Sequence, residues 1–184
     1  AHCIESLLPG GEDVEILIVN DGSKDDTAKI ADEYAAKYPT IVKAIHKENG
    51  GHGSAVNTGI ENATGIYFKV VDSDDWVKED AYLTILEKLR ELTGGVDTLD
   101  LLISNFVYEK EGERRKKVMR YKHVLPEYRM FGWEDVGRFH VGQYILMHSV
   151  IYRTEMLREC GLKVPFEDGY FEEIVEKLEK KLHA

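Results

Sequence analysis

The chain has 184 residues, with 34 acidic and 24 basic side chains and a formal net charge of -10 at pH 7. This acidic balance argues against nucleic acid or an anionic membrane as the main partner, because both carry dense negative charge. The length allows one domain with a sizeable core, and the two cysteines, Cys3 and Cys160, form neither a disulfide framework nor a metal-ligand pattern.

The first half of the chain alternates between strand and helix patterns. Short apolar runs predict strands at residues 14–19, 41–45 and 66–71. Apolar residues at helical spacing predict helices at residues 25–38, 54–62 and 78–92. This alternation indicates parallel strands joined by right-handed crossovers, which is the pattern of an α/β fold.

The second half of the chain is less regular. Strands are predicted at residues 99–108, 117–124 and 146–152, and helices at residues 154–160 and 170–182. The first two of these strands are expected to form a hairpin that turns near Gly112.

Polar or glycine-rich turns follow the three predicted strands of the first half, at residues 20–23, 49–53 and 72–75. Parallel strands bring such turns to one edge of the sheet, where ligands bind in α/β folds. Asp72 and Asp74 are separated by one residue, so in an extended chain they face the same side, while Asp75 points away. Carboxylates suit Mg²⁺ or Mn²⁺, and such an ion binds phosphate in turn. A plain turn followed by a helix N-cap would place aspartates at the same positions.

The segments VEILIVNDGSKDDT and HKENGGHGSAVNTGIENATGIYFKVVDSDDWV, in this order and spacing, resemble the family 2 glycosyltransferases of the GT-A fold. The resemblance is strongest over residues 1–92. It implies a three-layer α/β/α fold with a mainly parallel central sheet. It further implies that residues 1–184 form a single domain, with a nucleotide-sugar-binding half at 1–95 and an acceptor-side half at 96–184.

The resemblance implies transfer of a sugar from a nucleotide-diphosphate donor, often a UDP-sugar, to an acceptor hydroxyl with inversion. By similarity, Asp21 contacts the base, and Asp72 faces the ribose or the metal. Asp74 would ligate the Mg²⁺ or Mn²⁺ that bridges the diphosphate. Gly51 belongs to the glycine-rich turn, where the missing side chains let the backbone approach the nucleotide closely.

Inverting members of this family use a carboxylate downstream of the metal motif as general base. The chain offers two Glu-Asp pairs, which end at Asp135 and at Asp168. Asp168 is the predicted base, because its pair lies at the more typical distance and precedes a helical pattern. The alternative for Asp168 is a purely structural role at the N-terminus of that helix.

The resemblance also implies a saccharide or lipid-linked acceptor, a role in polysaccharide or glycoconjugate synthesis, and a cytoplasmic setting with possible peripheral association at the inner membrane face. The alternatives are a non-catalytic nucleotide-sugar-binding module or a truncated inactive fragment, and a sugar nucleotidyltransferase. Family members usually begin with an apolar strand that is central to the sheet, whereas this sequence opens in the helix that follows it. We therefore expect unpaired backbone groups on the neighbouring strands.

Overall fold

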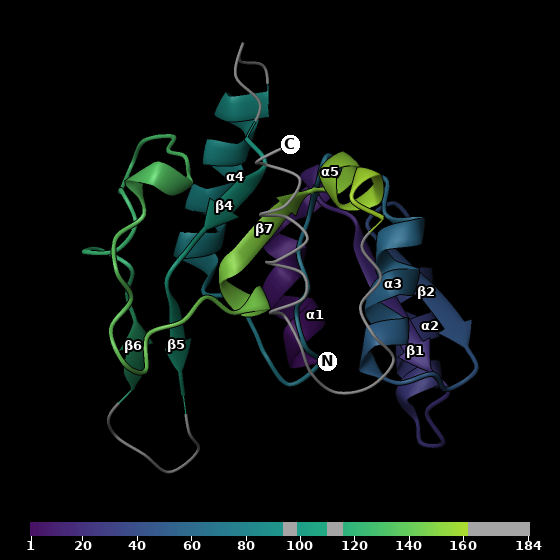
Figure 1. Cartoon of the computed structure of the whole chain (residues 1–184). Coiled ribbons are helices and arrows are strands. Elements are labelled where there is room, and N and C mark those ends of the chain that lie inside the picture. The colour runs from purple at the N-terminus through teal and green to yellow at the C-terminus, as the bar shows by residue number, and fades with distance from the viewer. Residues whose placement is uncertain (94–98, 110–115, 162–184) are drawn as a thin grey trace.

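The computed structural model describes residues 1–93, 99–109 and 116–161 (Figure 1). Its α-helices are α1 (His2–Leu7), α2 (Thr27–Lys37), α3 (His52–Asn62), α4 (Glu79–Thr93) and α5 (Thr154–Glu159). Its strands are β1 (Ile16–Asp21), β2 (Val42–Lys47), β3 (Tyr67–Phe68), β4 (Leu101–Ile103), β5 (Phe106–Tyr108), β6 (Lys117–Met119) and β7 (Val150–Arg153). Short 3-10 helices are η1 (Leu8–Asp13), η2 (Trp133–Asp135) and η3 (Met147–Ser149).

The parallel part of the fold is the pair β1–β2, which the two apolar runs of the sequence predicted. Their register runs from Ile16 beside Val42 to Asp21 beside Lys47. The helices α2 and α3 pack on this pair (Figure 1), and Ala31 of α2 is only 1% exposed because its small side chain allows close contact. This register sets the Asp21 carboxylate and the Lys47 ammonium group side by side at the carboxyl end of the pair, where the candidate site lies.

A second sheet has the strand order β3-β7-β4, and both of its pairings are antiparallel. The strand predicted at residues 66–71 forms a ladder only at Tyr67–Phe68, and the chain then continues without regular pairing toward Asp72. The strand predicted at 146–152 is β7, which begins later because the η3 turn precedes it. The mainly parallel sheet is thus represented in the described residues by the single pair β1–β2.

A cavity of about 1600 Å³ is lined by β1 on one side and by residues 66–71 on another. Within the part of the chain that the structure describes, β1 pairs only with β2, so its other edge has no strand partner. The edge of β3 that faces away from β7 likewise has no strand partner among the described residues.

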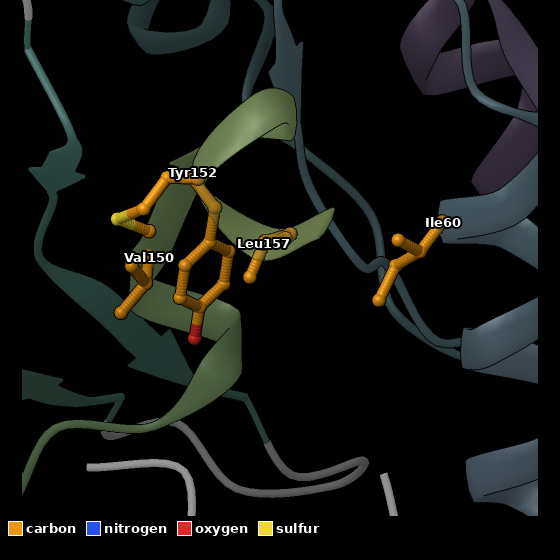
Figure 2. Packing of buried hydrophobic residues seen from close by; sticks show 5 residues of the cluster. Ile60, Val150, Tyr152 and Leu157 are labelled. Atoms are coloured by element: carbon orange, nitrogen blue, oxygen red, sulfur yellow. The ribbon is translucent and has the colours of Figure 1, made fainter. Parts of the chain in front are cut away.

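The main hydrophobic core joins α3, β7 and α5. Figure 2 shows its buried side chains, which are Ile60, Val150, Tyr152, Met156 and Leu157. Arg158 ties the same elements together, because its guanidinium donates to the backbone carbonyls of Ile60 at 2.7 Å and Ala63 at 2.6 Å. These carbonyls at the C-terminal end of α3 would otherwise have no helical partner. The core therefore holds α3 firmly, and α3 begins at the functional site.

Replacing Ile60 by valine is expected to lower the free energy of unfolding by about 1 kcal/mol, because it removes one buried methylene from a close-packed core. Ile60 is 6% exposed. The matched control is Ile66→Val, whose side chain is 57% exposed and whose replacement should change stability by less than about 0.5 kcal/mol. Urea unfolding of both variants measures the difference, and equal effects would contradict the assigned core.

The predicted hairpin is present as the antiparallel pair β5–β6, with Phe106 opposite Met119. Its strands are shorter than expected, because the chain breaks at Asn105, whose side-chain oxygen accepts a hydrogen bond from the Tyr121 amide at 3.1 Å. The upstream part of the predicted strand is β4, which joins the β7 sheet instead. The helix predicted at residues 170–182 lies outside the described residues.

Candidate functional site

The first half of the site is built around Asp21 at the carboxyl end of β1. Its carboxylate accepts a hydrogen bond from Lys47 Nζ at 2.5 Å. It also accepts from the backbone amides of Gly50 at 3.0 Å and Gly51 at 2.7 Å. The Lys47 ammonium, helped by these two amides, holds the pKa of Asp21 below its ordinary value against the opposing effect of burial. Asp21 therefore fastens the glycine-rich turn to the end of β1.

The backbone of this region requires glycine at two positions. Gly22 has φ +73°, and a Cβ there would lie 2.8 Å from the amide nitrogen of Asn49. Gly51 has φ +83° and is the N-cap of α3, with no side chain of its own to satisfy the helix N-terminus. Both positions have the left-handed conformation that side chains disfavour. The turn after β1 and the turn before α3 are thereby brought into direct contact.

A chain of hydrogen bonds behind Asp21 orients the turn that carries it. Asn20 is 6% exposed, and its side-chain oxygen accepts from the Ser23 amide at 3.0 Å. Its Nδ2 must then be the donor to His46 Nδ1, at 3.1 Å. The proton of a neutral His46 ring is consequently on Nε2, which donates to Asp32 at 2.9 Å.

The second half of the site lies at the end of the 66–71 segment. Asp72, Asp75 and His148 offer ligand atoms that all lie within 4.8 Å of one another. His148 Nδ1 is 3.3 Å from Asp75 Oδ2, and His148 Nε2 is 4.0 Å from Asp72 Oδ2. The Asp75 amide donates to the Asp72 carbonyl at 3.0 Å, and this tight turn directs both carboxylates toward the same imidazole.

The donor set of this second half fits a divalent cation. The Nδ1 atom of His148 is buried, and it has no hydrogen-bond partner in the described residues. Although Asp75 is near, the angles of that contact are not those of a hydrogen bond. A buried ring nitrogen without a partner is rare. Two carboxylates and an imidazole are ligands that Mn²⁺ accepts and that Mg²⁺ accepts through the oxygens.

The two halves meet at the start of α3. Gly51 donates its amide to Asp21, and the next residue, His52, places its Nε2 atom 3.2 Å from Asp72 Oδ1. Two consecutive residues thus contact Asp21 and Asp72, two of the three aspartates to which the resemblance gives a role in the donor site. The predicted convergence of the turns after the strands is present for Asp21, Gly51 and Asp72.

Lys69 lies close to Asp72, Asp75 and His148, which together form the acidic group of the site. Its ammonium donates to the backbone carbonyl of His148 at 2.7 Å. Burial lowers the pKa of Lys69 to about 8, and the negative charges of Asp75 and Asp72 oppose this shift. Cys3 is also close, since its thiol contacts the Asp72 carbonyl at 3.5 Å, and burial raises the pKa of this thiol.

Among the described residues, the acidic group includes neither of two other predicted carboxylates, Asp74 and Asp135. Asp74 is exposed, and the acidic group contains its neighbour Asp75, which we had expected to point away. Asp74 as a metal ligand stays a prediction. Asp168 lies outside the described residues. Asp135 ends η2 and is paired with Arg129 at 3.0 Å, and this hydrogen bond lowers the pKa of Asp135.

Sequence reasoning missed Lys69 and His148 as members of the site and misplaced Trp76. In the sequence, no metal-ligand spacing connects His148 to other residues. Its only signal is position, immediately before the strand β7 that lies beside β3. A large aromatic residue is usually buried, but Trp76 is 45% exposed and packs against the ring of His2, with centroids 5.1 Å apart.

Comparisons with known proteins show which family the chain resembles. The family model described as glycosyl transferase family 2 matches residues 1–172. The chain is 33% identical over 166 residues to the glycosyltransferase EpsJ of Bacillus subtilis (strain 168), a match that covers 88% of this chain and 46% of that protein. It is 40% identical over 170 residues to the glycosyltransferase YibD of Escherichia coli (strain K12), again covering 88% and 46%. The chain thus spans about half the length of these relatives.

Solved structures show the same fold. The crystal structure of S. aureus TarS 1-349 aligns with a TM-score of 0.68 at 23% identity, covering 93% of this chain and 48% of that one. The TarS structure in complex with UDP aligns with a TM-score of 0.64 at 22% identity, covering 90% and 46%. The fold is therefore GT-A. Separately, none of the described helices is long and apolar enough to cross a membrane. Because the family model extends over nearly the whole sequence, the chain belongs to glycosyl transferase family 2.

Proposed function

We propose that this chain carries the donor site of a metal-dependent, inverting glycosyltransferase that uses a nucleoside diphosphate sugar, most simply a UDP-sugar. The observation that carries the proposal is the contact of Gly51 with Asp21 and of His52 with Asp72. These contacts bring the glycine-rich turn and the acidic group together at one edge of the fold. The UDP complex of TarS, which has a similar fold, supports the choice of nucleotide.

Each half of the site has its own task in this proposal. Asp21 and the Gly51 turn receive the nucleoside, with the backbone close to the ligand because no side chain intervenes. Asp72, Asp75 and His148 hold Mg²⁺ or Mn²⁺, with Asp74 as the alternative second carboxylate. A bound divalent ion supplies charge stabilisation for the diphosphate as the bond to the sugar breaks.

The base is proposed to be Asp168, which would take the proton from the acceptor hydroxyl as that oxygen attacks the sugar carbon. Asp135 is the less suitable alternative, because its ion pair with Arg129 lowers its pKa and makes it a weaker base. The acceptor is proposed to be a saccharide or a lipid-linked saccharide. The proposed setting is polysaccharide or glycoconjugate synthesis in the cytoplasm, with peripheral association at the inner membrane face.

Calorimetry with UDP and with UDP-sugars, in Mn²⁺ and in EDTA, tests the donor site. Binding that requires the metal supports the proposal, and absence of binding under both conditions in the full-length protein would refute it. Release of UDP that requires both donor and acceptor then supports transfer. Metal-dependent binding without turnover would favour a binding module, and formation of pyrophosphate from a nucleoside triphosphate would favour a nucleotidyltransferase.

The variant Asp21→Asn is expected to weaken the binding of UDP about tenfold. Asparagine keeps the shape of the side chain but loses the charge that pairs with Lys47, and its NH₂ group would oppose the backbone amides of the glycine turn. Calorimetry in saturating Mn²⁺ measures the change. Asp25→Asn is the control, because Asp25 is exposed and its carboxylate accepts a hydrogen bond from the nearby Thr27 amide at 3.0 Å, away from the glycine turn. Equal affinities of the two variants would contradict the assigned role.

A further inference from the structure

Lys69 is a lysine that the proposed function does not use, although its ammonium binds the backbone of His148 and feels the charges of Asp72 and Asp75. It follows β3 directly and is partly buried. The hydrogen bond from its ammonium to the His148 carbonyl, 2.7 Å long, joins residues that are 79 positions apart. Three residues after Lys69 the same segment reaches Asp72. A single side chain thus connects the segment that carries the carboxylates with the turn that carries the imidazole.

The turn that carries His148 needs such an attachment, because η3 is only three residues long. On one side it is anchored by Ser149, which is fully buried and whose amide and hydroxyl both donate to the Leu146 carbonyl, at 2.9 and 2.6 Å. The Ser149 carbonyl also accepts from the Ser104 amide at 2.8 Å. These contacts fix the turn to its own sheet, whereas the Lys69 bond fixes it to the acidic segment.

We propose that Lys69 is a positioning residue, which holds His148 against Asp72 and Asp75 so that a ring nitrogen of His148 becomes a ligand of the bound metal. This inference rests on the metal centre of the proposed function. It assigns to Lys69 an action through His148, with no contact of its own to the metal or the donor. Groups that orient metal ligands in this way typically change metal affinity by about 10- to 100-fold when they are removed.

A purely electrostatic role for Lys69 predicts the opposite result. A positive charge close to a divalent ion repels it, so removal of that charge would strengthen metal binding. Positioning predicts that removal weakens metal binding, because the imidazole is no longer held in place. The sign of the change in affinity therefore separates the two roles.

The test uses Mn²⁺ alone, added to the metal-free whole chain. Calorimetry gives the affinity, and pulsed electron paramagnetic resonance detects a ¹⁴N nucleus bound to Mn²⁺. We expect a nitrogen signal in the wild type that is lost in His148→Ala, which also excludes His52 as its source. Lys69→Met should lose the same signal and bind Mn²⁺ about tenfold or more weakly. Lys69→Arg keeps a charged donor to the carbonyl and should restore the signal at least in part.

Lys78→Met is the matched control, because the Lys78 side chain is 79% exposed and pairs only with Asp80 among the salt bridges of the described residues. It should behave as the wild type does, and circular dichroism verifies that each variant is folded. A nitrogen signal that persists in Lys69→Met, or Mn²⁺ affinity that is unchanged or stronger, overturns the inference. Lys69→Arg provides a second test in case Lys69→Met does not fold. If Lys69→Arg binds Mn²⁺ as tightly as the wild type but lacks the nitrogen signal, the inference is also overturned.

Failure of this inference is distinguishable from failure of the proposed function. A wild type that binds UDP with Mn²⁺ but shows no nitrogen signal overturns the positioning role and leaves the donor site intact. The full pattern of nitrogen signals without any binding of UDP supports the positioning role and refutes the donor site.

Discussion

Asp72→Asn is expected to lower the rate of sugar transfer by the full-length enzyme about a thousandfold. A divalent ion beside a breaking phosphate bond contributes several kcal/mol of charge stabilisation, and each 1.4 kcal/mol corresponds to about a factor of ten in rate. Asp72 is central to the acidic group, because it lies next to both His52 and His148. Initial rates at saturating donor and acceptor measure the loss, with Mn²⁺ affinity measured in parallel.

A pair of further variants decides which second carboxylate belongs to the metal centre. If the group seen in the structure is the ligand set, Asp75→Asn should weaken Mn²⁺ binding strongly and Asp74→Asn only slightly. The reverse order would restore the ligand predicted from the sequence. Asp80→Asn is the control, because its side chain is 70% exposed and its salt bridge is with Lys78. A loss of activity in Asp80→Asn equal to that in Asp72→Asn would contradict the assigned centre.

Lys69→Met is expected to change how the stability of the metal-free protein depends on pH. The pKa of Lys69 is about 8 in the folded chain, whereas an unfolded lysine titrates at about 10.4. Between these values the unfolded chain binds more protons, so the stability of the wild type rises with pH. The rise should amount to about 3 kcal/mol across this window, since one pKa unit corresponds to about 1.4 kcal/mol. Below pH 8 the penalty for burying the charged ammonium is present in full.

The measurement is urea unfolding in EDTA at several values from pH 7 to pH 10. Methionine carries no proton, so any stability advantage of Lys69→Met over the wild type should shrink as pH rises. Lys78→Met should instead follow the wild-type curve, because its ammonium is exposed. A constant difference between Lys69→Met and the wild type over the whole range would show that Lys69 has no lowered pKa.

The first half of the fold was predictable because its signals are local. The apolar run that ends at Asp21 and the turn at residues 20–23 lie next to each other in the sequence, and a strand followed by such a turn suffices to place a carboxylate at the sheet edge. The same reasoning brought Asp72 to that edge. It could not show that Asp75 and not Asp74 would face the imidazole, because a one-residue change in direction within a tight turn has no sequence pattern.

The second half of the site depends on pairing between distant segments. His148 and Lys69 are joined by a bond that no spacing rule anticipates. The antiparallel pairing of β7 with β3 places them together, and the alternating pattern of the first half says nothing about this pairing with a strand of the second half. Trp76 shows the same limit, since a large aromatic residue is usually buried, but here 45% of its surface is exposed directly after the acidic turn.

The neighbouring residues Gly51 and His52 give the donor site a thermodynamic property. Gly51 contacts Asp21 of the nucleoside half, and His52 contacts Asp72 of the metal half. Both residues stand at the start of α3. A displacement of this helix start that accompanies the loading of one half must alter the geometry of the other. Linkage then requires symmetry: the factor by which Mn²⁺ changes the affinity for UDP equals the factor by which UDP changes the affinity for Mn²⁺.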